Sequence, residues 1–169
     1  GYNTTSYWQQ PITDSIIRPQ ENVGAFRAQM VNCHNGKILR IDPSTGDGIP
    51  NNPFYLNGNP RAARSRVWAM GFRNTFRFTV RPNTGASQRT IGDIGQIYAG
   101  EVGNGDYEEL NLIDAPGYNC GWPIFEGILS RGNYDVVKNL PNKDEPNPLY
   151  GTGGCTQQFF SFQNLLKQA

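Results

Sequence analysis

The central part of the chain carries short segments in which apolar and polar residues alternate, with turn-forming residues between them. A short apolar run at residues 67–70 is the first of four candidate strands, and the others lie at residues 75–80, 97–102 and 107–113. Alternation of this kind predicts β-strands. In the second strand it places Phe76, Phe78 and Val80 on one face. We therefore predict four consecutive antiparallel strands, with no helix between them.

The flanking segments are less regular. Residues 1–25 have few apolar anchors and two prolines, so we expect an irregular segment there. Residues 26–31 and 36–42 are short apolar–polar runs joined by Asn and Gly, which predicts a hairpin. Residues 42–48 are rich in turn formers and predict a sharp turn. From Cys120 onward the chain is rich in proline and glycine, and we expect mostly loops.

Four short consecutive strands in about fifty residues are typical of one blade of a β-propeller. The fold class we predict is therefore all-β, a β-propeller of four-stranded antiparallel blades. Residues 66–113 would be one complete blade, and residues 1–169 would be only part of a propeller. Residues 37–42 would be an outer strand of a second, partial blade. Because one and a half blades cannot close a ring and would leave apolar faces exposed, we expect the remaining blades of the same protein as partners.

Composition narrows the class of protein. The 169 residues carry 15 Lys and Arg against 14 Asp and Glu, with no block of basic residues, so nucleic acid is not an expected partner. No run of about 18 apolar residues is present, so we expect no transmembrane segment. The first ten residues do not have the pattern of a signal peptide. The 20 glycines, 12 prolines and 12% aromatic residues favour a sheet protein with long loops over a helical bundle.

The three cysteines and the single histidine do not have the spacing of a metal site. Cys33 is adjacent to His34, which is a poor geometry for joint ligation. Cys120 and Cys155 both lie in glycine-rich loops, so a disulfide between them is our candidate, worth about 3 to 4 kcal/mol. Three buried free thiols are the alternative. No serine or cysteine pairs with His34 in a pattern that predicts nucleophilic catalysis.

Two polar clusters lie at predicted strand ends. Arg73 and Asn74 follow a strand that ends at Gly71, which places a guanidinium and an amide at a loop mouth, where they suit a carboxylate ligand. The alternative is a local ion pair and a turn. Residues 100–109 hold four acids around three glycines. Carbonyls and carboxylates are ligands of Ca²⁺, although the spacing is not that of an EF-hand; a solvated acidic turn is the alternative.

Six motifs resemble those of the soluble glucose/sorbosone dehydrogenases, which use pyrroloquinoline quinone (PQQ), and occur in the same order. They are GKILRID (36–42), DGIPNNPF (47–54), VWAMGFRN (67–74), GEVG (100–103), YEELN (107–111) and YNCGWP (118–123). The resemblance implies a six-bladed β-propeller that binds PQQ and Ca²⁺ at the top of its central channel. It also implies oxidation of the anomeric carbon of an aldose to a lactone, an external electron acceptor, and a secreted, periplasmic or cell-surface location.

The resemblance implies roles for particular residues. Arg73 and Asn74 would contact PQQ, and the backbone carbonyls of Gly103 and Asn104 would ligate Ca²⁺. Glu108 would be an acid that assists the catalytic base. An arginine suits this site because PQQ is a tricarboxylate, and Ca²⁺ would polarise the reactive carbonyl of the quinone.

The chain also departs from the family. Phe72 stands where the best-known members have His, and residues 102–104 are Val-Gly-Asn where they have Gln-Gly-Pro. Residues 86–95 resemble an insertion. His34 lies too close to the strand that follows it to be the family's catalytic histidine, so we expect this sequence alone to lack a complete active site.

A second function stays open beside the dehydrogenase. The same propeller resembles the central domain of hedgehog-interacting proteins, which are non-enzymatic extracellular binding modules, and a fold does not fix a function. Phe72 and Val102 replace polar residues and favour this alternative. We expect an enzyme at the level of the family, with partner binding as the competing hypothesis.

Overall fold

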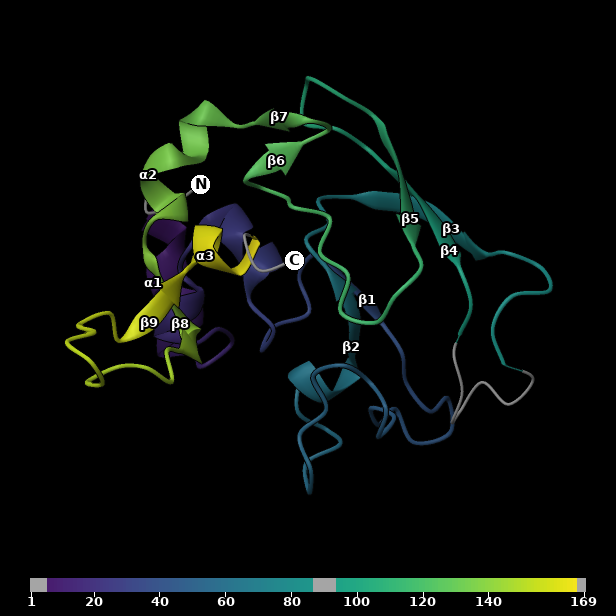
Figure 1. Ribbon diagram of the computed structural model, residues 1–169, viewed down its shortest axis with the longest axis horizontal. Coiled ribbons are helices and arrows are strands. Elements are labelled where there is room, and N and C mark those ends of the chain that lie inside the picture. The colour runs from purple at the N-terminus through teal and green to yellow at the C-terminus, as the bar shows by residue number, and fades with distance from the viewer. Residues whose placement is uncertain (1–5, 87–93, 167–169) are drawn as a thin grey trace.

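The computed structural model describes residues 6–86 and 94–166 (Figure 1). Its strands are β1 (Lys37–Leu39), β2 (Val67–Met70), β3 (Thr75–Val80), β4 (Ile97–Glu101), β5 (Glu109–Ile113), β6 (Phe125–Glu126), β7 (Leu129–Ser130), β8 (Pro141–Pro146) and β9 (Phe159–Ser161). Its α-helices are α1 (Gln9–Thr13), α2 (Asp135–Lys138) and α3 (Phe162–Leu166). Its 3-10 turns are η1 (Ser6–Trp8), η2 (Pro19–Glu21), η3 (Gly24–Gln29), η4 (Arg64–Arg66) and η5 (Gly132–Tyr134).

Helices are short throughout the described residues. The longest is the six-residue turn η3, in agreement with the prediction of a sheet protein rather than a helical bundle for this part of the chain. None of these helices has the length and apolar character needed to cross a membrane. The segment predicted to be irregular, residues 1–25, folds into short helical turns where it is described.

The strands pair antiparallel in four small sheets. The largest has the order β3-β4-β5, and the others are the pairs β1-β2, β6-β7 and β8-β9. In Figure 1 the three-stranded sheet lies on the right, and β8, β9 and the α-helices lie on the left. A mostly-β chain built of small antiparallel sheets agrees with the predicted fold class, whereas closure into a propeller stays a prediction.

The four strands predicted between residues 66 and 113 are all present, but they do not share one sheet as predicted. β2 pairs with β1, with Lys37 opposite Met70, instead of with β3. Residues 117–120 occupy the other edge of β2: Met70 N–H donates to the Tyr118 carbonyl at 2.8 Å, and the Met70 carbonyl accepts from Cys120 N–H at 2.9 Å. With both edges of β2 occupied, β3 begins a separate sheet.

The predicted hairpin over residues 26–31 and 36–42 is wrong in its first arm. Residues 24–29 form the 3-10 turn η3, and only residues 37–39 of the second arm form a strand. Phe26 and Met30 are buried in a core cluster with Cys33, Ile124 and Phe162, which a straight strand at the edge of β1 would not reach. The sharp turn at 42–48 is confirmed by the hydrogen bond from Gly46 N–H to the Asp42 carbonyl at 2.7 Å.

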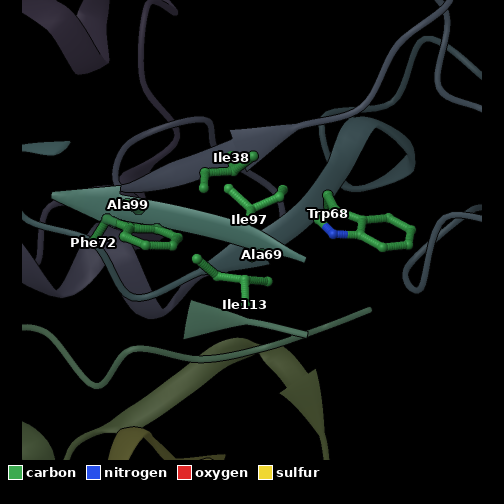
Figure 2. Packing of buried hydrophobic residues seen from close by; sticks show 7 residues of the cluster. All are labelled: Ile38, Trp68, Ala69, Phe72, Ile97, Ala99 and Ile113. Carbon is green, nitrogen blue, oxygen red and sulfur yellow. The ribbon is translucent and has the colours of Figure 1, made fainter. Parts of the chain in front are cut away.

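The main core lies between two sheets. Ile38, Trp68 and Ala69 from β1 and β2, with Phe72 just beyond β2, pack against Ile97, Ala99 and Ile113 from β4 and β5. Figure 2 shows Ile38, Ile97 and Ile113 at the centre of this cluster, with Phe72 on one side and Trp68 on the other. The β1-β2 pair therefore covers one face of the β3-β4-β5 sheet, as neighbouring propeller blades cover one another.

Apolar side chains of β3 and β5 remain exposed. Phe76 and Phe78, predicted to lie on one face of their strand, are 73% and 58% exposed. A register shift between Thr75 and Arg77 interrupts the alternation, and β3 is the edge strand of its sheet. Leu110 on β5 is also 73% exposed. Further blades would cover such surfaces, and these blades stay a prediction.

Candidate functional site

A pocket of about 570 Å³ opens where β1 begins and β2 ends. What we call its first wall consists of Gly24, Ala25, Arg27, Ala28, Asn35 and Gly36. Its second wall consists of Phe72, Arg73, Asn74, Asn104 and Trp122. The lining holds two arginines, three asparagines and two aromatic residues, and none of the described residues that line it is an acid.

The structure brings three of the predicted site residues together. Arg73, Asn74 and Asn104 all line the second wall, although Asn104 is about thirty residues from the other two in sequence. Gly103 and Glu108 are not part of the lining. Glu108 is exposed, and its Oε1 accepts a hydrogen bond from Gly103 N–H at 3.0 Å. Its role in catalysis therefore stays a prediction from the resemblance.

The first wall is held by a lysine that sequence reasoning did not single out. Lys37 Nζ donates to the carbonyl oxygens of Arg27 at 3.0 Å, Ala28 at 2.8 Å and Asn35 at 2.7 Å. All three of these residues line the pocket. Desolvation by burial lowers the pKa of Lys37 to about 8, against the opposing influence of Cys33. The Lys37 amine thus binds three backbone carbonyls of residues 27–35 and holds this segment in place.

The Arg73–Asn74 turn is held by a buried carboxylate. Glu101 is 6% exposed, and its Oε1 accepts hydrogen bonds from the backbone N–H of Arg73, at 2.6 Å, and of Asn74. Its Oε2 accepts from Thr75 Oγ at 2.9 Å. Glu101 therefore fixes the backbone of the two residues that the motif predicted to bind a ligand.

The Arg73 guanidinium contacts neutral oxygens. Nη1 donates to the Val102 carbonyl at 2.9 Å, and Nη2 donates to Asn104 Oδ1 at 3.2 Å. The guanidinium carbon lies 5.6 Å from the centroid of the Trp122 ring. Within the described residues no carboxylate forms an ion pair with this guanidinium, so the alternative of a local ion pair is not what the structure has. Its positive charge is available to an anionic ligand.

A second buried carboxylate organises the loop that carries Asn104. Glu126 Oε1 accepts hydrogen bonds from the backbone N–H groups of Asn104 at 2.6 Å, Asp106 at 3.2 Å and Tyr107 at 3.3 Å. Its Oε2 pairs with Arg131 Nη1. Desolvation by burial opposes ionisation of Glu126, but the three N–H donors and Arg131 hold its pKa below the ordinary value.

The family model for glucose/sorbosone dehydrogenases matches residues 18–151, which include every residue of the pocket and of the loop beneath it. The chain belongs to the glucose/sorbosone dehydrogenase family. Members of this family are oxidoreductases that act on sugars, and the order of motifs in the sequence predicted this assignment.

The acids that the sequence offered as cation ligands have other partners in this glucose/sorbosone dehydrogenase chain. Glu101 and Glu108 accept hydrogen bonds from backbone N–H groups, and Asp106 pairs with Arg131. Glu109 accepts from Asn111 Nδ2 and from Gly127 N–H. No cluster of three or more acidic, cysteine or histidine side chains suited to a metal occurs in the described ranges. The carbonyls of Gly103 and Asn104 accept no hydrogen bond from any described residue, and their role as Ca²⁺ ligands stays a prediction from the resemblance.

The predicted disulfide between Cys120 and Cys155 is not formed, and all three cysteines are free thiols. Cys120 packs against the core cluster of β1, β2, β4 and β5. Cys155 lies in the turn between β8 and β9, where its Sγ accepts from Asn147 Nδ2 at 3.4 Å. Desolvation, together with the negative charges of Glu101 and Glu109, raises the pKa of Cys120 to about 12, so it is a packing residue and not a nucleophile.

Sequence reasoning missed the residues that hold the pocket. Glu101 and Lys37 lie inside motifs, so their motifs were recognised but their roles were not. Glu126 and Arg131 lie in the stretch expected to be loops, where no alternation points to them. A carboxylate between apolar residues in Ile124-Phe125-Glu126-Gly127 was the one available signal of a buried acid.

Proposed function

We propose that the pocket binds PQQ together with Ca²⁺, as part of a sugar dehydrogenase that oxidises the anomeric carbon of an aldose to a lactone. The observation that carries this proposal is the Arg73 guanidinium, which lines an acid-free pocket without a carboxylate partner among the described residues. A planar tricarboxylate suits a cavity of about 570 Å³ whose lining residues include two arginines, three asparagines and Trp122.

Three residues of the second wall would have distinct parts. Arg73 would hold a carboxylate through the fork of its guanidinium, and Asn74 would offer both a donor and an acceptor at the same edge. Trp122 would present a flat apolar face that excludes water. When bound, PQQ would accept the two electrons of the oxidation, and Ca²⁺ would polarise its reactive carbonyl.

The polar groups of the pocket meet the needs of PQQ more fully than those of Ca²⁺. Two carbonyl oxygens, those of Gly103 and Asn104, are too few for an ion that takes six to eight oxygens. The cation would need further oxygens, which the carboxylates of PQQ and water can supply. We therefore propose that Ca²⁺ binds with PQQ and not before it. The sugar, an external electron acceptor and further blades of the propeller complete the partners we propose, at a secreted, periplasmic or cell-surface location.

One observation favours a second candidate, a non-enzymatic extracellular binding module of the hedgehog-interacting type. Phe72 is 3% exposed and apolar where the best-known dehydrogenases of the family have histidine. No described residue of the lining is an acid or a histidine that could accept the proton of a sugar hydroxyl. Under this alternative the cationic pocket would have no redox role.

The test is a thermal unfolding titration of the full-length protein with PQQ and Ca²⁺, with each component alone as reference. We expect the melting temperature to rise with both components present, since a ligand that binds the folded state stabilises it by mass action. Arg73→Ala should lose most of that rise, because a charged hydrogen bond is worth about 1.5 to 3 kcal/mol. Arg77→Ala, on the exposed strand β3, is the matched control and should keep it. If PQQ and Ca²⁺ together do not raise the melting temperature of the wild-type protein, the dehydrogenase proposal is wrong and the binding module takes its place.

A further inference from the structure

The loop of residues 102–108 carries one wall residue, Asn104, yet has little of its own to hold it in place. It includes Gly103 and Gly105, the latter with φ +128°, and its side chains from Asn104 to Glu108 are exposed. A loop with two glycines and no buried side chain loses much conformational entropy on ordering. Its fixed shape therefore needs an anchor outside the loop.

That anchor is Glu126. Its side chain is 2% exposed, and one of its oxygens accepts from three backbone N–H groups of the loop, those of Asn104, Asp106 and Tyr107. Hydrogen bonds to an ionised acceptor are about twice as strong as neutral ones. Without the carboxylate, all three N–H groups would have to turn outward to water, and the loop would be released.

Direct contacts lead from Glu126 to the ligand-facing groups. Asn104 N–H is bound to Glu126, and Asn104 Oδ1 accepts from Arg73 Nη2 at 3.2 Å. Displacement of Asn104 would therefore also remove one partner that orients the Arg73 guanidinium. Both residues line the pocket, whereas Glu126 does not.

A second set of contacts runs through Arg131. This side chain is 10% exposed, and its Nη1 pairs with both Glu126 and Asp106. Its guanidinium carbon lies 5.9 Å from the centroid of the Trp122 ring, which is another wall residue. The Glu126–Arg131 pair thus supports two separate positions of the second wall, Asn104 and Trp122.

We infer that Glu126 and Arg131 are positioning residues of the ligand pocket: they hold Asn104, Trp122 and, through Asn104, Arg73 in the arrangement that binds the ligand, without touching it. This inference rests on the proposed function for the identity of the ligand. Groups that orient ligand-binding residues from behind are commonly worth ten- to a hundredfold in affinity.

The test uses the full-length protein and two measurements. The first is amide hydrogen exchange of residues 102–108 without ligand, and the second is calorimetric binding of PQQ in the presence of Ca²⁺. Glu126→Ala should speed exchange of the loop amides at least about tenfold, leave exchange in β3, β4 and β5 unchanged, and weaken binding about ten- to a hundredfold. Asp114→Asn removes one exposed acid just after β5 and should change neither measurement.

Variants of smaller effect keep the test decisive if Glu126→Ala does not fold. Glu126→Gln keeps the side-chain shape and one acceptor oxygen, so it should restore part of the slow exchange and part of the affinity. Arg131→Met should weaken PQQ binding while leaving the three N–H bonds to Glu126 in place. Unchanged exchange in the Glu126 variants, or wild-type affinity in all three variants, would overturn the inference. Absence of PQQ binding to the wild-type protein would instead overturn the proposed function, and the exchange data would still show whether Glu126 holds the loop.

Discussion

A Cβ added to Gly36 would lie 2.2 Å from the carbonyl oxygen of Phe72, because the two walls of the pocket meet at these residues. The same Cβ would lie 2.7 Å from the Ala28 side chain. Phe72 N–H also donates to the Gly36 carbonyl at 3.2 Å, so the contact is bonded as well as close. The motifs at 36–42 and 67–74 are thus joined backbone to backbone.

Gly36→Ala should destabilise the protein by about 2 to 4 kcal/mol, since the new methyl group meets backbone that cannot move aside. Gly36 also has a φ of +61°, which adds strain for any residue with a side chain. Gly58→Ala is the control: Gly58 has a φ of +79° but nothing within 4 Å of the added Cβ. Urea unfolding of both variants should show a cost of only about 1 kcal/mol at Gly58. Equal losses would mean that the clash at Gly36 is relieved at no cost.

The pKa of Lys37 gives a prediction on pH. Its folded-state pKa of about 8 lies below the ordinary 10.5, so the folded state disfavours the charged amine. Below pH 8 the amine is charged in both states and its burial lowers stability by a constant amount. Between pH 8 and 10.5 the unfolded state binds more protons than the folded state, and the stability contributed by this group rises with pH.

The measurement is the unfolding free energy of wild type minus that of Lys37→Met, from pH 7 to 10. We expect this difference in unfolding free energy to become more positive as the pH rises above 8, because the wild type gains stability there and the variant does not. Lys143→Met, at an exposed position of β8, should give a flat difference. Direct ¹⁵N titration of the Lys37 amine checks the midpoint, and a midpoint near 10.5 would show that the amine is not desolvated.

Glu101 gives a prediction on the Arg73–Asn74 turn. Glu101→Ala leaves three donors without an acceptor, on Arg73, Asn74 and Thr75, and should cost about 2 to 4 kcal/mol in chemical unfolding. Glu101→Gln should cost much less, because its Oε1 can still accept from both N–H groups and its amide can donate to the Thr75 hydroxyl. If the glutamine variant is as unstable as the alanine variant, the negative charge and not the hydrogen-bond pattern is what the turn requires.

The sequence predicts local structure better than it predicts which segments meet. The strands β3, β4 and β5 could be predicted because each is encoded by a pattern of only five to six consecutive residues. The partner of β2 does not follow, since its edges are occupied by residues 37–39 and 117–120, which lie about thirty and fifty residues away. The 3-10 turn at residues 24–29 was mistaken for a strand because its run of apolar residues is too short to separate the two periods.

The candidate site divides in the same way. Arg73 and Asn74 could be predicted because they lie in a motif that the family carries as a continuous string, and Asn104 because it directly follows the motif at 100–103. Lys37, Glu101 and Glu126 could not be predicted, because their side chains contact backbone atoms. A contact with the backbone does not depend on which side chain the contacted residue carries, so the sequence does not reveal it. The disulfide was wrong because two glycine-rich loops were assumed to be neighbours, whereas Cys120 lies in the core and Cys155 in the β8–β9 turn.

The amides of the buried Gln29 and the half-buried Asn119 bind each other reciprocally. Asn119 Nδ2 donates to Gln29 Oε1 at 2.7 Å, and Gln29 Nε2 donates to Asn119 Oδ1 at 3.1 Å and to the Trp122 carbonyl at 2.6 Å. Gln29→Leu and Asn119→Leu should each cost about 2 to 3 kcal/mol, because each leaves buried polar groups of the other unpaired.

The double variant should cost less than the sum by about 1 to 2 kcal/mol, since the second substitution removes the group that the first left without a partner. Asn142 provides the matched control. It donates to the backbone carbonyl of Gln29 at 3.2 Å, which Gln29→Leu leaves in place, so Gln29→Leu with Asn142→Leu should be additive within about 0.5 kcal/mol. Urea unfolding of the two cycles measures both couplings. Additivity in the Gln29–Asn119 cycle would mean that water replaces each lost amide, and that the pair does not lock the turn that carries Trp122.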